Sequence, residues 1–174
     1  CKETLDHIST ITSPLSVLCC AGKSRTGKSF LLNRLADIAP GDGFGVGSTV
    51  QACTHGLWVH SDPIPSEDGS TVTLLVDTEG MDATDAEGDH DLEVMTLALL
   101  LCSRFLFNSV GHVDESAIQT LGVLTRLSED MVPSSNSSGT HEGRSAPHLV
   151  WVLRDFALQM VDKQGKEMEK EDYL

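Results

Sequence analysis

Short apolar runs alternate along the chain with stripes of apolar residues at helical spacing. The run at residues 15–21 is largely apolar, which is typical of a parallel strand buried on both faces. Residues 105–110 and 148–153 predict two more strands. Residues 56–61 and 71–76 flank a turn region rich in proline and glycine, and together they predict a hairpin.

Three segments between these runs predict helices: residues 30–38, 92–102 and 114–130. Pro40 and Gly41 would end the first helix, and the second is apolar on most sides and therefore predicted to lie in the core. The apolar stripe of the third helix consists of Ile118, Leu121, Leu124 and Leu127. Strands alternating with helices predict an α/β fold with a doubly wound, mostly parallel sheet, helices on both faces and a ligand at the carboxyl ends of the strands.

A phosphate-binding pattern, GxxxxGKS, lies between the first strand and the first helix. Its glycines let backbone N–H groups converge on phosphate oxygens, its lysine reaches the β and γ phosphates, and its serine hydroxyl binds Mg²⁺. The pattern therefore predicts a P-loop that holds a nucleoside triphosphate. The predicted nucleotide-binding residues here are Gly22, Lys23, Ser24, Arg25, Thr26, Gly27, Lys28, Ser29 and Phe30.

The net charge of this chain limits the kinds of partner that it binds. With 12 basic and 26 acidic residues the charge is −14, which opposes nonspecific binding to nucleic acid or to an anionic membrane face. We therefore expect no nucleic-acid partner, and membrane association only through regions outside this chain. A nucleotide is anionic too, and Lys23, Arg25 and Lys28 supply positive charge inside the motif itself.

A second phosphate element follows the strand-like run at residues 71–76. Asp77 would hold Mg²⁺, usually through water, and Gly80 would give its N–H to a γ phosphate. Between the two elements, Thr49 and Thr54 are both able, by their chemistry, to close over the metal and the γ phosphate. The phosphate loop alone leaves ATPase, GTPase and kinase open, and the second element answers much of that question.

The remaining composition suggests the setting of the domain. Five cysteines form no CxxC pair, as is usual in the reducing cytosol, so we expect a cytoplasmic protein. Residues 40–49 are rich in glycine and predict a mobile loop, and residues 132–147 have the composition of a disordered loop. The chain begins without Met, and we expect it to be part of a longer protein.

Five blocks together are more specific than any single motif: GKSRTGKSFLLNRL, GFGVGSTVQACTHGLW, LLVDTEG, FNSVG and WVLRDF. In content and order they resemble the guanylate-binding proteins, large GTPases of the dynamin superfamily. The resemblance covers nearly the whole chain and implies that residues 1–174 form the N-terminal part of a GTPase domain of the GB1/RHD3 type, truncated at its C-terminus. Atlastins are similar at the first and last blocks but fit GSTVQ and DTEG less well.

The resemblance implies roles for matching residues. Ser29, Thr54 and Asp77 would bind Mg²⁺, with Thr54 rather than Thr49 as the switch threonine. The catalytic residues would be Arg25, Lys28, Thr54 and Glu79, the last acting indirectly. Arg25 would act as an arginine finger in cis once two GTPase domains meet, which implies a nucleotide-dependent homodimer. Arg154 and Asp155 would replace the usual Asn-Lys-x-Asp motif and select guanine, with GTP as substrate and GDP as ligand.

One position departs from the family pattern. Many members carry a serine two residues before the switch threonine, where this chain has Ala52, and that serine helps to place the attacking water. Slower or differently organised hydrolysis is therefore expected. The alternatives to a dimer-activated GTPase are a GTP-dependent interaction module with weak or no hydrolysis and an atlastin-like membrane-remodelling GTPase.

Overall fold

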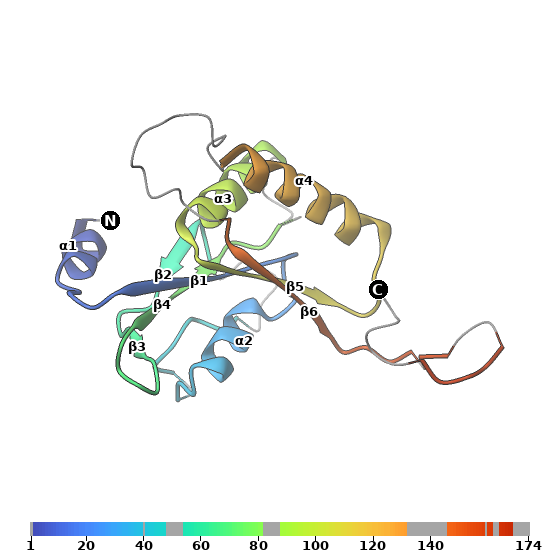
Figure 1. Ribbon diagram of the computed structural model, residues 1–174, viewed down its shortest axis with the longest axis horizontal. Coiled ribbons are helices and arrows are strands. Elements are labelled where there is room, and N and C mark those ends of the chain that lie inside the picture. The colour runs from blue at the N-terminus through green and yellow to red at the C-terminus, as the bar shows by residue number, and fades with distance from the viewer. Residues whose placement is uncertain are drawn as a thin grey trace.

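The computed structural model describes residues 2–39, 41–47, 54–81, 88–131, 146–158, 160–161 and 164–168. These residues form one α/β unit built around a single sheet (Figure 1). The helices are α1 (Lys2–Ser9), α2 (Lys28–Leu35), α3 (Gly88–Leu101) and α4 (Glu115–Met131). The strands are β1 (Leu15–Ala21), β2 (Leu57–Val59), β3 (Ile64–Pro65), β4 (Val72–Thr78), β5 (Arg104–Val110) and β6 (His148–Arg154).

The sheet is mixed, with its long strands parallel. The strand order is β2-β4-β1-β5-β6, and β1 pairs in parallel with both β4 and β5. β2 and the short β3 both pair antiparallel with β4, so the predicted hairpin is confirmed. Because β1 and β4 run parallel in the centre of the sheet, their carboxyl ends place the P-loop next to Asp77.

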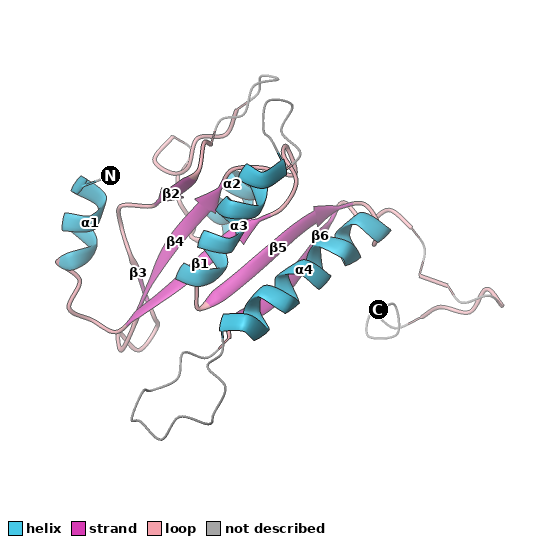
Figure 2. Ribbon diagram, turned by 90° about the horizontal axis from the view of Figure 1, so that it is seen from above, coloured by secondary structure: helices cyan, strands magenta, loops and turns pink. Residues whose placement is uncertain are grey.

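Helices cover both faces of the sheet. α3 and α4 lie over one face and α2 over the other, as the two views in Figures 1 and 2 show. The adjacent residues Cys19 and Cys20 are both fully buried, the first in the core under α3 and α4 and the second in the core under α2. Alternation along a strand that is buried on both faces explains this arrangement. The predicted doubly wound α/β fold is confirmed.

The predicted elements are all present, with some changes at their ends. α2 ends at Leu35, before Pro40 and Gly41, and α3 begins at Gly88, before the predicted start. Ile118 was wrongly placed on the buried stripe of α4, since its side chain is 56% exposed, whereas Ala117 is buried beside Leu124. Because successive residues of a helix are rotated by 100°, Ile118 and Leu124 lie on different faces of α4. The face of α4 that packs against the core is therefore narrower than the apolar stripe in its sequence.

Three features go beyond the sequence prediction. Helix α1 has no buried residue and the two-residue strand β3 is too short to be recognised by pattern. Residues 41–47 form no helix or strand, as expected, but Phe44 is buried and both its backbone groups bond to the Asn33 side chain. This loop is therefore anchored on α2 at its middle. Residues 132–145, which include most of the predicted disordered loop, lie outside the described residues.

No helix in the described part of the chain is long and apolar enough to cross a membrane.

Candidate functional site

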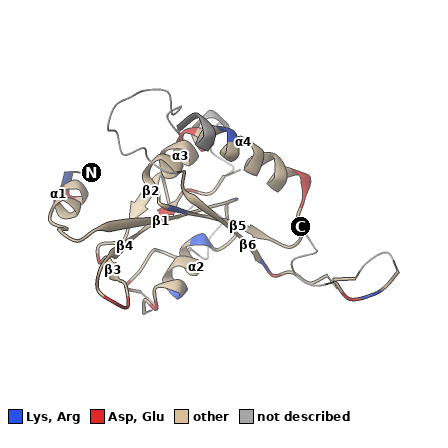
Figure 3. Cartoon of the chain, viewed as in Figure 1, with Lys and Arg blue, Asp and Glu red and all other residues tan. Residues whose placement is uncertain are grey.

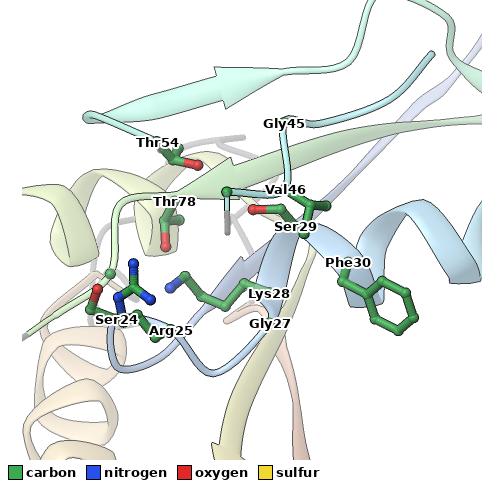
Figure 4. A pocket seen from close by; sticks show the side chains of 12 residues that line it. Ser24, Arg25, Gly27, Lys28, Ser29, Phe30, Gly45, Val46, Thr54 and Thr78 are labelled. Atoms are coloured by element: carbon green, nitrogen blue, oxygen red, sulfur yellow. The ribbon is translucent and has the colours of Figure 1, made fainter. Parts of the chain in front are cut away.

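A cavity of about 280 Å³ opens at the carboxyl ends of β1 and β4, above the start of α2 (Figure 4). Eight predicted site residues line it: Ser24, Arg25, Gly27, Lys28, Ser29, Phe30, Thr54 and Gly80. Four further residues complete its wall: Gly45, Val46, Gly47 and Thr78. The P-loop and the segments after β4 and before β2 thus come together around one space, as the sequence predicts.

The P-loop turns directly from β1 into α2. Gly27 sits in the left-handed region with φ 78°, which glycine adopts without steric penalty, and the helix begins at the next residue. The first turn of α2 therefore directs its free N–H groups and the positive end of its dipole at the cavity. This arrangement is suited to holding the phosphates of a nucleotide.

Lys28 is the charged residue at the centre of the P-loop. Its side chain is buried, and its Nζ donates a hydrogen bond of 3.1 Å to the carbonyl oxygen of Lys23, within the same loop. Burial lowers the pKa of Lys28, while the negative charge of Asp77 acts in the opposite direction. An anionic phosphate in the cavity would favour the charged amine further.

Asp77, near the carboxyl end of β4, is fully buried. Its Oδ2 accepts hydrogen bonds from Ser29 Oγ at 2.6 Å and from Thr54 Oγ1 at 3.0 Å, while its Oδ1 is buried without a partner. Burial raises the pKa of Asp77, although both hydroxyls and Lys28 favour the charged form. Two hydroxyls and one carboxylate with an unsatisfied oxygen are a donor set that fits Mg²⁺, a cation that prefers oxygen ligands and often retains water.

Three segments meet at Glu79, immediately after β4. Its Oε2 accepts the backbone N–H of Gly56 at 2.8 Å, and its own N–H donates to the Gly56 carbonyl at 2.8 Å. His90 of α3 and His55 also face this carboxylate. Burial raises the pKa of Glu79, but the Gly56 N–H and the two histidines outweigh it and hold the pKa below its usual value.

Two glycines of the site are required by contacts between loops. A Cβ at Gly22 would lie 2.1 Å from the backbone oxygen of Asn108, and a Cβ at Gly80 would lie 2.3 Å from the Cα of Ser24. Real Cβ atoms essentially never come this close to another heavy atom, so any side chain would push the P-loop away from its neighbours. The role of Gly22 in phosphate access stays a prediction, and the structure adds a second requirement, close packing against β5.

Arg154, at the end of β6, supports the P-loop from behind. Its Nη1 donates to the carbonyl oxygens of Thr26 and Gly27, both at 3.1 Å, and its guanidinium lies 5.6 Å from the ring centre of Phe30. Asn108 Nδ2 donates to the same Thr26 oxygen at 3.0 Å. Arg154 thus contacts the P-loop, while Asp155 is exposed beyond the strand with φ 53°.

The other predicted residues take separate positions. Arg25 is exposed, has φ 63°, and shares the P-loop side of the cavity with Lys28, opposite Thr54 (Figure 4). Lys23 and Thr26 line a neighbouring cavity of about 210 Å³ between the P-loop, β5 and α4. Basic residues in the described part of the chain are spread over several elements (Figure 3). Positive charge at the cavity therefore comes from the P-loop itself.

Sequence reasoning missed some of the residues that shape the site. Gly45, Val46 and Gly47 form a wall of the cavity because Phe44 anchors their loop, a contact that no local pattern reveals. Asn108 had a detectable signal, since it is a polar residue within an apolar strand. Thr49 and Ala52 lie outside the described residues.

The sheet order, the P-loop at the end of β1 and the buried carboxylate at the end of β4 define a P-loop nucleoside triphosphate-binding domain. The family profile described as "Guanylate-binding protein, N-terminal domain" matches residues 1–174. Mouse Guanylate-binding protein 2 and human Guanylate-binding protein 5 are each 38% identical over 181 residues, and human Guanylate-binding protein 1 is 35% identical over 181 residues. The chain therefore belongs to the guanylate-binding protein family.

The alignments cover 99% of this chain but only 30% of each of these relatives. The chain thus spans about a third of the length of the curated proteins that it matches.

Proposed function

We propose that this domain binds GTP and hydrolyses it with the help of Mg²⁺. The observation that carries the proposal is the convergence of Ser29 and Thr54 on Asp77 beside the P-loop cavity. Membership of the guanylate-binding protein family supports the choice of GTP among the nucleotides.

The residues of the cavity have distinct tasks in this proposal. The first turn of α2 and Lys28 bind the phosphates, and the N–H of Gly80 faces the terminal phosphate. Ser29, Thr54 and Asp77 would hold Mg²⁺, which when bound neutralises charge on the β and γ phosphates. Because Thr54 also belongs to the segment before β2, its bond to Asp77 couples that segment to the ligand.

Two further parts of the proposal concern residues outside the metal set. Asp155 would select guanine, because its carboxylate accepts from the N1–H and the exocyclic amine, a donor pair that adenine lacks. Arg25 would stabilise the transition state in cis when two domains pair through their nucleotide faces. Its exposure at the cavity mouth supports this role, and in the described part of the chain no hydrogen bond or ion pair holds its guanidinium.

Phosphate release measured against protein concentration tests the proposal. We expect the rate per site to rise with concentration and to fall about 10³-fold or more in Arg25→Ala, since this is the usual contribution of an arginine finger. Arg34→Ala, an exposed arginine at the far end of α2, is the matched control and should behave as wild type. A rate per site that is independent of concentration, or an unaffected Arg25→Ala variant, would refute the dimer mechanism.

The same assay separates the alternative function. Absence of phosphate release together with tight GTP binding would instead support a GTP-dependent interaction module, for which Ala52 is the motivation.

A further inference from the structure

The Glu79 carboxylate joins the segment before β2 to the first turn of α3. Its side chain is only 10% exposed, and its Oε2 accepts from Gly56 N at 2.8 Å and lies 3.3 Å from His90 Nε2. The backbone of Glu79 also donates to the Gly56 carbonyl oxygen. Gly56 is therefore held by Glu79 on both its backbone groups.

This hold on Gly56 fixes Thr54, which lies two residues earlier. Thr54 Oγ1 is 3.0 Å from Asp77 Oδ2, and it faces the cavity in which phosphate would bind. Glu79 itself does not line that cavity. The Glu79 carboxylate is therefore placed to act on the reaction through the backbone of Gly56. A group that orients this carboxylate acts on the reaction through Glu79.

His90 is the better placed of the two histidines to orient Glu79. It contacts Oε2, the same oxygen that accepts the Gly56 N–H, and its side chain is 49% exposed. His55 approaches Oε1 at 3.5 Å, outside the usual hydrogen-bond range, and is 75% exposed. A carboxylate only accepts hydrogen bonds, so the proton of a neutral His90 ring must be on Nε2.

We propose that His90 is a positioning residue for GTP hydrolysis, which keeps the Glu79 carboxylate on the Gly56 N–H and thereby Thr54 against Asp77. The inference rests on the proposed GTPase function. The proposal gives the first turn of α3 a part in the reaction, although none of the side chains that the structure describes in α3 lines the cavity.

Steady-state hydrolysis of Mg²⁺·GTP by the full-length protein provides the first test. We expect His90→Ala to lower kcat about three- to tenfold, as for a lost, partly exposed hydrogen bond to a charged group, with little change in KM. His90→Gln retains an N–H donor and should recover most of the rate. His55→Ala should lose less than His90→Ala, and His148→Ala, at the exposed start of β6, should match wild type.

Two results would overturn the assignment. One is a kcat for His90→Ala within about twofold of wild type, which would mean that the lost hydrogen bond contributes little. The other is an equal effect of His90→Ala in wild-type and Glu79→Ala backgrounds, because two groups that act through one contact are not additive.

Hydrogen exchange at Gly56 keeps the inference testable if the protein releases no phosphate. With Mg²⁺ and a non-hydrolysable GTP analogue bound, the peptide 54–60 should exchange faster in His90→Ala than in wild type, and His90→Gln should restore protection. Unchanged exchange would refute the role of His90. Absence of hydrolysis with changed exchange would instead refute the proposed GTPase activity and leave the contact in place.

Discussion

Arg154 and Asp155 are neighbours in one motif, yet Arg154 contacts the P-loop and Asp155 is exposed, so their substitutions should have different effects. Arg154 contacts the P-loop carbonyls of Thr26 and Gly27, whereas Asp155 is exposed just beyond the end of β6. We expect Arg154→Ala to weaken the binding of all nucleotides alike and Asp155→Asn to change the preference between GTP and ATP.

The contacts of Arg154 give the size of the first effect. Two hydrogen bonds from a charged donor are worth about 1.5–3 kcal/mol each when buried, and partial exposure reduces this to about 1 kcal/mol each. The 5.6 Å approach to the Phe30 ring adds about 0.5–1 kcal/mol. If roughly half of this lost free energy had stabilised the binding conformation of the P-loop, GTP affinity falls about tenfold.

Titration of GTP, GDP and ATP against wild type, Arg154→Ala, Arg154→Lys and Asp155→Asn is the assay. Arg154→Lys should restore part of the affinity, because one ammonium reproduces the charge but not the planar guanidinium. The GTP-to-ATP ratio should stay within about threefold in both Arg154 variants, since neither of the P-loop contacts reads the base. A large change of the GTP-to-ATP ratio in Arg154→Ala would refute the assignment of Arg154 to the P-loop. An unchanged ratio in Asp155→Asn would refute the assignment of Asp155 to the base.

Three other substitutions follow from the site. Gly80→Ala should destabilise the domain by about 1–3 kcal/mol in denaturant unfolding, because its Cβ would overlap Ser24, and a wild-type midpoint would contradict the packing. Asp77→Ala should lower Mg²⁺-dependent GTP affinity about 10–100-fold while affinity in EDTA changes little, and equal losses in both conditions would contradict the metal assignment. Glu79→Gln removes a carboxylate whose pKa lies below the ordinary value of 4.5. The variant should therefore be less stable than wild type above pH 4.5, and the difference should vanish as the pH falls through the lowered pKa. A difference in the free energy of unfolding that is constant with pH would contradict this prediction.

The central strands and the P-loop could be predicted because their signals are local. The run at β1 is apolar since both of its faces are buried, and the GxxxxGKS pattern reflects backbone requirements within eight residues. β6 was predicted from the same kind of run, although Leu149 and Val150 prove to be exposed. Its place in the sheet depends on pairing with β5, which the run does not encode.

Features that depend on distant contacts could not be predicted. The function of Gly22 depends on the carbonyl of Asn108, and the role of Arg154 as a support of the P-loop depends on residues more than a hundred positions earlier. The anchoring of Phe44 by Asn33 likewise turns a glycine-rich segment into a wall of the cavity. In each case the residue type is required by a neighbour that is close in space but distant in sequence, which sequence spacing does not reveal.

The hydrogen bond between Lys28 and its own loop has a consequence for how a ligand is captured. A free lysine side chain has about 2 kcal/mol of rotamer entropy to lose on binding, and Lys28 has lost much of it already in the bond to the Lys23 carbonyl. An arriving phosphate therefore meets an amine that is already aligned, and the amine only has to exchange one hydrogen-bond acceptor, the Lys23 carbonyl oxygen, for a phosphate oxygen. Such preorganisation makes the bound state tighter without adding a contact, and the free domain bears its conformational penalty in advance.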